Sequence, residues 1–202
     1  MSKNKNGNKT RIEKFNSTHL AGLIFYLVVV ALAYVGSQRV IAQTDSSGAF
    51  LTYTNVSYGF TMKYPPDWTV NDTSTSGVRF TSPDHFTNVL VHIGNQTSQT
   101  GRSLEEAAKL ATAHPPTGFN LLELNANNYF LSGHPALRIV GVKSFGGSNG
   151  IPPFDVKAMS LVTYLGGKAY QVTYGGESER YSTNLQTGRE MIDSFQIIRG
   201  GQ

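Results

Sequence analysis

Histidine and carboxylate side chains are the residues of this chain that could bind a metal ion. Zinc and copper sites need three or four such ligands within about 2.0–2.3 Å of the metal. The chain has five histidines, and its Asp84-His85 pair lies seven residues before His92. No His-x-His or His-Glu-x-x-His pattern occurs. We expect the histidines to be solvated or to lie in turns; the alternative is a metal site formed by Asp84, His85 and His92.

Catalytic groups are harder to assemble from this sequence. The chain has no cysteine, which excludes thiol nucleophiles, thiolate metal ligands and disulfides. The glycine-rich stretch 146–150 is interpreted as a flexible loop, because no helix is predicted to begin there, as a nucleophile elbow or a phosphate-binding loop requires. We therefore predict a protein that is not an enzyme and has no cofactor. The wider loop 146–153 is predicted to be a contact region, since such loops on rigid scaffolds often carry recognition.

Three asparagines in the second part of the chain begin N-x-Ser/Thr sequons. They are Asn55, Asn71 and Asn95. Such sequons are acceptor sites for N-glycosylation where the host has that machinery. All three follow the apolar leader described below, so we expect them on the outer side of the membrane as potential glycosylation sites.

The segments that would position these candidates alternate as strands do. In 58–64 the aromatic and apolar residues share one face, which is typical of a half-buried strand. Prolines at 65–66 end it, and a short strand resumes at 68–70, with Trp68 predicted to lie in the core. In 89–93 three apolar residues alternate inward, which leaves His92 on the opposite face.

A helix and two pairs of extended segments follow. Ser103 begins a capping box, and small apolar residues recur after it at helical spacing. Extended segments are predicted at 119–131 and 136–145, joined by 132–135. Two more, at 154–165 and 168–174, are joined by Gly166-Gly167, a pair that favours a type I′ hairpin turn.

The last predicted element is a helix with one apolar stripe. Its members are Tyr181, Leu185, Gly188, Ile192 and Phe195, which step by three or four residues. Gly188 weakens a helix, so we expect its missing side chain to permit close contact with the sheet. Residues 197–198 are predicted to be extended. Adjacent hairpins and two amphipathic helices predict an α+β fold, an antiparallel β-sheet flanked by helices.

The leader before the domain is basic and then apolar. Leu20 to Val35 contains no charged residue and would span about 24 Å as a helix, or more if it extends to Ser37. Five of the six leader cations precede it, so the N-terminus is predicted to be cytoplasmic and the rest outside. We favour a permanent anchor, a single-pass transmembrane segment; the alternative is a signal peptide cleaved after Ala42, which would secrete the domain.

These features divide the chain into four parts. We predict a basic cytoplasmic tail at 1–19, a transmembrane segment or signal-peptide core at 20–37, a linker at 38–49 and an extracytoplasmic domain at 50–199. The net positive charge belongs to the leader, because residues 43–202 carry 11 of the 17 basic and 12 of the 13 acidic residues and are nearly neutral. No basic run in that part could supply clustered phosphate contacts, so nucleic acid is excluded as a partner.

The domain resembles the PsbP-like family in the order and spacing of several features. These are Tyr58-Gly-Phe60 leading into Tyr64-Pro-Pro-Asp-Trp68, the capped helix after Ser103, Gly133-His-Pro-Ala136 before a long strand, the Gly166-Gly167 hairpin with Tyr170, and a closing helix that ends at Ile192-Asp-Ser-Phe195. The resemblance covers about residues 50–198. It implies a central antiparallel sheet between helical layers and a non-catalytic protein that binds or stabilises partners.

Together these features predict a non-catalytic, membrane-tethered extracytoplasmic module for binding or assembly. Its expected partners are the membrane, through residues 20–37, and an unidentified extracytoplasmic protein. The alternative is a secreted or tethered binder of a small ligand or a metal ion.

Overall fold

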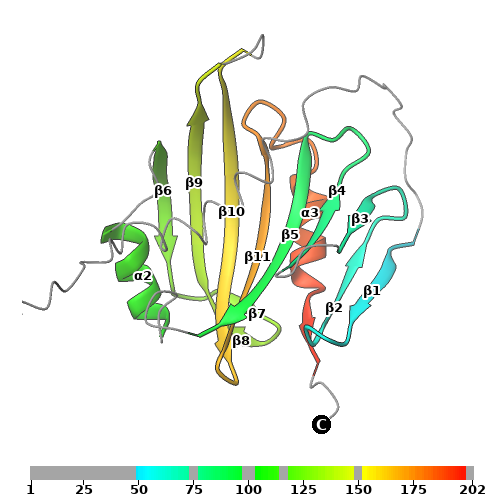
Figure 1. Ribbon diagram of the computed structural model, residues 1–202, viewed down its shortest axis with the longest axis vertical. Helices are drawn as coiled ribbons and strands as arrows, with labels where there is room; N and C mark the ends of the chain where they lie inside the picture. The colour runs from blue at the N-terminus through cyan, green and yellow to red at the C-terminus, as the bar shows by residue number, and fades with distance from the viewer. Residues whose placement is uncertain (1–48, 73–76, 97–102, 114–117, 148–151, 199–202) are drawn as a thin grey trace, which may run out of the picture.

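A seven-stranded antiparallel sheet forms the centre of the molecule (Figure 1). The computed structural model describes residues 49–72, 77–96, 103–113, 118–147 and 152–198. In sheet order the strands are β3 (Thr69–Asn71), β4 (Gly77–Thr81), β5 (Thr87–Asn95), β11 (Lys168–Glu177), β10 (Phe154–Leu165), β9 (Leu137–Phe145) and β6 (Phe119–Asn125). A smaller sheet has the order β1 (Leu51–Asn55), β2 (Phe60–Tyr64) and β12 (Gln196–Ile197), and β7 (Phe130–Leu131) pairs with β8 (His134–Pro135).

One side of the large sheet, the α3 face, carries the main core. Alternate residues of the central strands point to it, and they include Val89, Val91, Met159, Leu161, Val172 and Tyr174. The helix α3 (Leu185–Asp193) and the smaller sheet cover these side chains. Phe60 of β2 stacks on Phe195, which follows α3, with ring centroids 5.4 Å apart. Trp68 is only 6% exposed in this core, as its sequence context predicted.

The opposite side, the α2 face, is covered in part by the helix α2 (Leu104–Ala113). The small apolar residues predicted to face the sheet do so: Leu104, Ala107, Ala108 and Ala111 pack against Leu137, Ile139 and Val162. The Ser103 hydroxyl accepts a hydrogen bond from the Glu106 amide at 3.1 Å, which confirms the predicted N-cap. Within the described residues, therefore, the two helices lie on opposite faces of an antiparallel sheet, and the predicted α+β architecture is confirmed.

The turn between β10 and β11 has the predicted geometry. Leu165 pairs directly with Lys168, so the connection is a two-residue hairpin loop. Gly166 and Gly167 have φ values of +58° and +75°. A type I′ turn needs positive φ at both central positions, which glycine adopts without steric cost.

Two predicted segments are shorter in the structure than in the sequence pattern. The extended run over 119–131 breaks after Asn125, whose side-chain oxygen accepts a hydrogen bond from the Asn127 amide at 2.8 Å, and Asn128 then has φ +64°. An Asx turn of this kind offers the backbone an alternative to the strand ladder, so β7 is a separate strand. The closing helix holds only Leu185–Asp193; Tyr181 and Phe195 flank it and still reach the core.

The predicted leader lies outside the described residues, including the apolar segment 20–37 and the candidate cleavage site after Ala42. The same holds for residues 148–151, half of the predicted contact loop 146–153. In the part of the chain that the structure describes, no helix has the length and hydrophobicity to cross a membrane.

Candidate functional site

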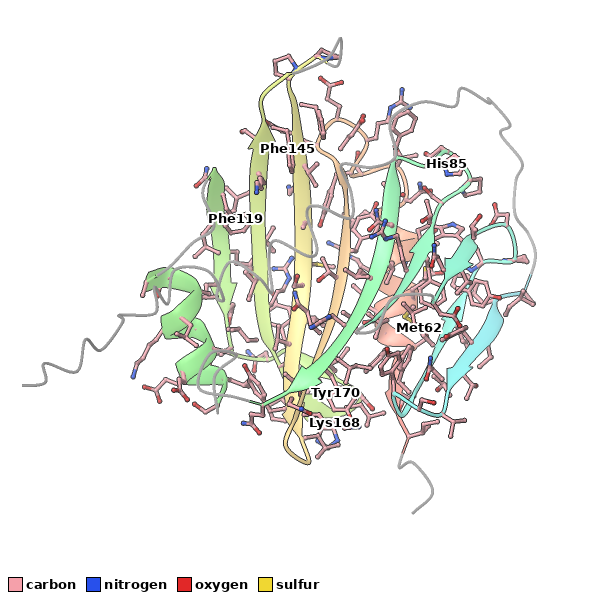
Figure 2. The ribbon with its side chains drawn as sticks, viewed as in Figure 1. Met62, His85, Phe119, Phe145, Lys168 and Tyr170 are labelled. Atoms are coloured by element: carbon pink, nitrogen blue, oxygen red, sulfur yellow. The ribbon has the colours of Figure 1, made fainter. Side chains whose placement is uncertain are left out.

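The three candidate metal ligands lie in two different places. Asp84 and His85 belong to the turn between β4 and β5, whereas His92 lies within β5 on the α2 face, opposite Gln171. The Asp84 carboxylate accepts hydrogen bonds from the Ser82 hydroxyl and the Phe86 amide, and these two bonds hold it within the turn. Figure 2 shows His85 at one end of the molecule.

Metal binding therefore has no geometric support among the described residues. Nowhere in the described part of the chain are three His, Asp or Glu side chains close enough together to hold a metal ion. His92 is half-buried, and this burial lowers the pKa of its imidazole. A neutral imidazole is a competent metal ligand, but the structure does not bring Asp84 or His85 to it.

The three sequon asparagines differ in what their side chains do. Asn71 and Asn95 are exposed. Asn55 is half-buried and holds the β1–β2 turn: its Oδ1 accepts from the Tyr58 amide at 2.9 Å, and its Nδ2 donates to the Tyr53 hydroxyl at 3.1 Å. A glycan on Asn55 would have to displace that second hydrogen bond, because Nδ2 is the atom that is glycosylated.

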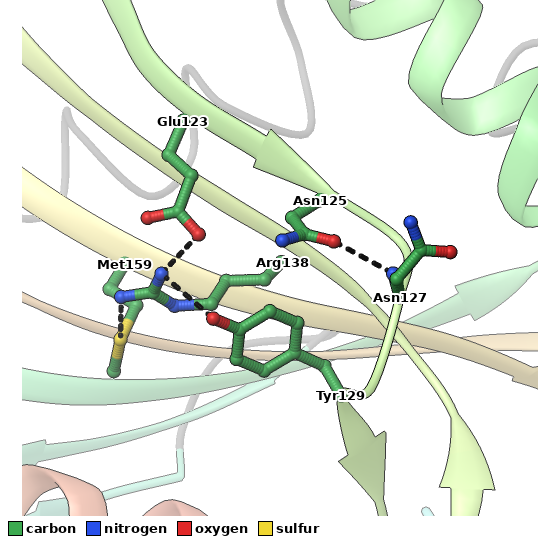
Figure 3. A network of polar contacts seen from close by, with 6 residues as sticks. All are labelled: Glu123, Asn125, Asn127, Tyr129, Arg138 and Met159. Atoms are coloured by element: carbon green, nitrogen blue, oxygen red, sulfur yellow. Dashed lines mark hydrogen bonds and ion pairs between the residues drawn. The ribbon is translucent and has the colours of Figure 1, made fainter.

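A charged network that the sequence patterns did not indicate lies on the α3 face. Arg138, in β9, forms an ion pair with Glu123 of β6, and the same guanidinium nitrogen donates to the Tyr129 hydroxyl at 3.2 Å. Its second terminal nitrogen lies 3.6 Å from the Met159 sulfur. The Arg138 and Glu123 side chains are 18% and 36% exposed. Figure 3 shows these side chains converging on the guanidinium.

The loop between β6 and β7 places Tyr129 over this arginine. The Asn125–Asn127 hydrogen bond tightens the loop, and the Tyr129 carbonyl accepts from the Ala136 amide at 2.8 Å. The Tyr129 ring then lies with its centroid 5.1 Å from the Arg138 guanidinium carbon, a cation–π distance. Arg138 is thus fixed by a carboxylate, a phenol and an aromatic face, and little side-chain entropy remains to be lost on binding.

Two more cations lie near this network. The Lys157 ammonium is 5.0 Å from the centroid of the Tyr181 ring. Burial raises the pKa of the Tyr181 phenol, whereas the charges of Arg138 and Arg189 act to lower it. We call this region the Arg138 surface, formed by Arg138, Lys157, Arg189, Glu123, Tyr129 and Tyr181. These six residues carry three cations and one paired carboxylate, while Asp155 shares the face of β10 with Lys157 and Glu190 follows Arg189 in α3.

The Arg138 surface is suited to binding anions. Helix α3, which carries Arg189, packs against β11 and β5. Arg138 lies in β9, which is two strands away from β11 in the sheet. A fixed guanidinium binds carboxylate or phosphate oxygens by charge-assisted hydrogen bonds, and Lys157 lies on the same face of β10, four residues along the strand from Leu161, the partner of Arg138. Nucleophilic catalysis needs a hydroxyl or thiol hydrogen-bonded to a base, and these six residues contain no such pair.

A second polar group lies buried on the α2 face. The hydroxyls of Ser160 and Thr173 are 2.6 Å apart, and the Gln171 side-chain nitrogen donates to both. All three residues are buried. Gln171 Oε1 has no hydrogen-bond partner among the described residues. The hydroxyls are satisfied by one another, so this group fixes the packing of β10 on β11.

Comparisons with known proteins give a likeness of fold. No protein-family model matches the sequence, and a search of curated proteins finds no match. The solution structure of the cyanobacterial PsbP protein from Synechocystis has a TM-score of 0.52 at 15% identity, over 78% of this chain and 98% of that one. The Ran-binding protein Mog1p of Saccharomyces cerevisiae has a TM-score of 0.49 at 9% identity, over 75% and 97% of the two chains.

A larger protein from Bacteroides thetaiotaomicron also matches. Its TM-score is 0.48 at 14% identity, over 75% of this chain and 49% of that one, so the present chain spans about half its length. The likeness to cyanobacterial PsbP confirms the fold that the sequence resemblance implied.

Proposed function

We propose that this chain is a non-catalytic member of the PsbP-like family that binds an extracytoplasmic protein at the outer surface of a membrane. Residues 20–37 would hold it there, with the basic tail in the cytoplasm. The similarity in fold to cyanobacterial PsbP supports the architecture of such a module. The partner segment would be acidic and would bind at the Arg138 surface.

The observation that carries this proposal is a guanidinium, that of Arg138, fixed on the side of the domain that also carries Lys157 and Arg189. Arg138 is held by Glu123 and Tyr129, while Arg189 is exposed and Lys157 half-buried on the same side. Arginine beside tyrosine is a pairing enriched at protein interfaces, where planar groups bind with small entropic cost. Charge complementarity would select the partner and accelerate the encounter.

Site-specific photo-crosslinking tests this proposal. Asn120 is exposed and lies in register with Val142 and, beyond it, Lys157, so a photoreactive residue at position 120 samples the Arg138 surface. The matched control is a photoreactive residue at Lys109, which is exposed on α2 and therefore on the other face. Both full-length variants would be irradiated in native membranes.

We expect a discrete adduct from position 120 that is absent from position 109. Reversing charge with Lys157→Glu and Arg189→Glu together should abolish it, and added salt should weaken it, because exposed charges are screened within about 8–10 Å at physiological ionic strength. Lys109→Glu, which reverses a single charge on the other face, should leave the adduct intact and is the matched control for Lys157→Glu alone. An adduct that survives the double reversal, or equal adducts from both positions, would contradict the proposal.

A further inference from the structure

Three turns from distant parts of the sequence meet at one end of the molecule. The Ile198 amide donates to the Gly59 carbonyl of the β1–β2 turn, and the Ile197 amide donates to the Ser132 hydroxyl of the β7–β8 turn. Thr163, near the end of β10, donates to the Pro135 carbonyl of β8. We call this region the turn end; Figure 2 shows Lys168 and Tyr170 there, with His85 and Phe145 at the other end.

Exposed apolar side chains gather at the turn end. Val56 is 67% exposed in the β1–β2 turn, Phe130 is 62% exposed in β7, and Leu165 is 38% exposed beside the β10–β11 turn. They are three of the five large hydrophobic residues that are exposed in the described part of the chain. Exposed apolar residues scattered singly need no explanation, but three on neighbouring turns indicate an interaction surface.

Charge is also distributed unevenly between the two ends. Segments 55–59, 94–96, 126–135, 165–169 and 196–198 form the turn end and contain no Asp or Glu, whereas they include Lys168 and His134. The carboxylates nearest in sequence are Glu123 and Asp193, and the charge of Glu106, in the first turn of α2, acts on Tyr164, the residue before Leu165. The opposite end carries Asp84, Asp155 and Glu179 together with the cations Lys143, beside Phe145, and Arg180, over Phe86. The segments of the turn end themselves bring no carboxylate to an anionic surface.

From these observations we infer that the turn end lies on the lipid bilayer, with Val56, Phe130 and Leu165 in the headgroup region and Lys168 facing anionic lipid. Apolar and basic residues without carboxylates are the composition of interfacial membrane contacts. This inference rests on the tether in the proposed function. The linker 38–49 could span at most about 40 Å when extended, and strand β1 leads directly from its end to Val56.

The absence of cysteine from the chain makes a direct test available. Single cysteines at Val56, Phe130 and Leu165 in the full-length protein would each carry an environment-sensitive fluorophore, with Glu179→Cys at the opposite end as the control and Ser57→Cys as a second, polar site in the β1–β2 turn. Each labelled protein would be reconstituted into vesicles of phosphatidylcholine and phosphatidylglycerol, isolated by flotation, and compared with vesicles that also contain nitroxide-labelled lipid.

We expect nitroxide lipid to reduce the fluorescence of the labels at 56, 57, 130 and 165, and to leave the label at 179 unchanged. Lys168→Glu should lessen this loss in vesicles that contain phosphatidylglycerol. A chain that floats with the vesicles but shows no quenching at the turn end keeps its tether and overturns the inference. Labels that report an apolar environment without nitroxide quenching would mean that a protein covers the turn end, which also overturns it. A chain that fails to float contradicts the tether of the proposed function and, with it, this inference.

Discussion

At Gly188 a single missing side chain sets the distance between α3 and the sheet. A Cβ atom at this position would lie 2.3 Å from Cδ2 of Tyr174 in β11, closer than packed atoms approach. The close contact predicted from the helical spacing is therefore confirmed. Tyr174 cannot easily move, because its hydroxyl donates to the Tyr181 carbonyl at 2.6 Å and its ring is fully buried.

We predict that Gly188→Ala destabilises the protein, although alanine is the better helix former. Overpacking costs about 1–3 kcal/mol, whereas the gain in helix propensity is at most about 1 kcal/mol. Chemical denaturation would measure the loss. Gly146→Ala is the control, since nothing lies within 4 Å of a Cβ built there, and it should have little effect. A stabilised Gly188→Ala variant would show that α3 does not pack on Tyr174.

His92 makes stability depend on pH in a predictable direction. Burial lowers the pKa of its imidazole below the ordinary value of about 6.5. At a pH between the lower pKa of the folded state and the ordinary pKa of the unfolded state, the unfolded chain binds the proton more tightly. The free energy of unfolding therefore falls as pH decreases through this range. The stabilisation is complete above about pH 6.5 and is lost as pH falls through the pKa of the folded state.

The pH dependence can be measured by thermal unfolding between about pH 7.5 and about pH 5, the range that brackets an ordinary histidine. We predict that His92→Gln removes part of the fall in midpoint that the wild-type protein shows as the solution is acidified. His134→Gln controls for the loss of a histidine elsewhere. An unchanged slope in the His92 variant would mean that the folded state does not disfavour the charged imidazole.

At the scale of elements, the turn between β10 and β11 requires a backbone conformation that glycine adopts without steric cost. Gly166 has φ +58° and no atom lies within 4 Å of a Cβ built on it. Gly166→Val should therefore cost about 1–2 kcal/mol, because the left-handed conformation is unfavourable for a residue with Cβ and no clash contributes. Gly166→Asn should be nearly neutral, since asparagine suits type I′ turns. Equal losses in the two variants, measured by denaturation, would point to another cause.

The elements with regular hydrophobic alternation could be predicted from sequence. The strands around Met62, Val91 and Tyr170, the capped helix α2 and the glycine hairpin all follow local rules. Two strands could not: β1 is mostly exposed, so its sequence lacks a core-facing alternation, and β4 is short and begins with glycine. The break after Asn125 was missed because its Asx turn interrupts a run that otherwise alternates.

The Arg138 surface shows the limit of the local rules most clearly. A charged residue at an inward position of an apolar strand was the available signal, since Arg138 alternates with Val140, which is buried in the main core. Its partners come from β6, from the loop before β7 and from β10. Such a site is created by strand pairing over many residues, and no spacing in the sequence encodes it.

At the scale of the whole molecule, the proposals define one orientation relative to the membrane. The turn end would contact lipid, and the opposite end, which carries Asp84, Asp155 and Glu179, would face away from the membrane. The Arg138 surface adjoins the turn end, because Tyr129 belongs to both, and it extends along the α3 face toward Lys157. A membrane-associated acidic partner would bind there, beside the lipid contact.

The tether is central, because it places both the partner surface and the turn end. Fractionation of carbonate-washed membranes from cells that express the full-length chain tests it directly, with the N-terminus of the recovered protein determined by sequencing. We predict that the domain stays in the membrane pellet and retains residues 20–37. Recovery wholly in the supernatant, with an N-terminus at Gln43, would show instead that the leader is cleaved and the domain is secreted.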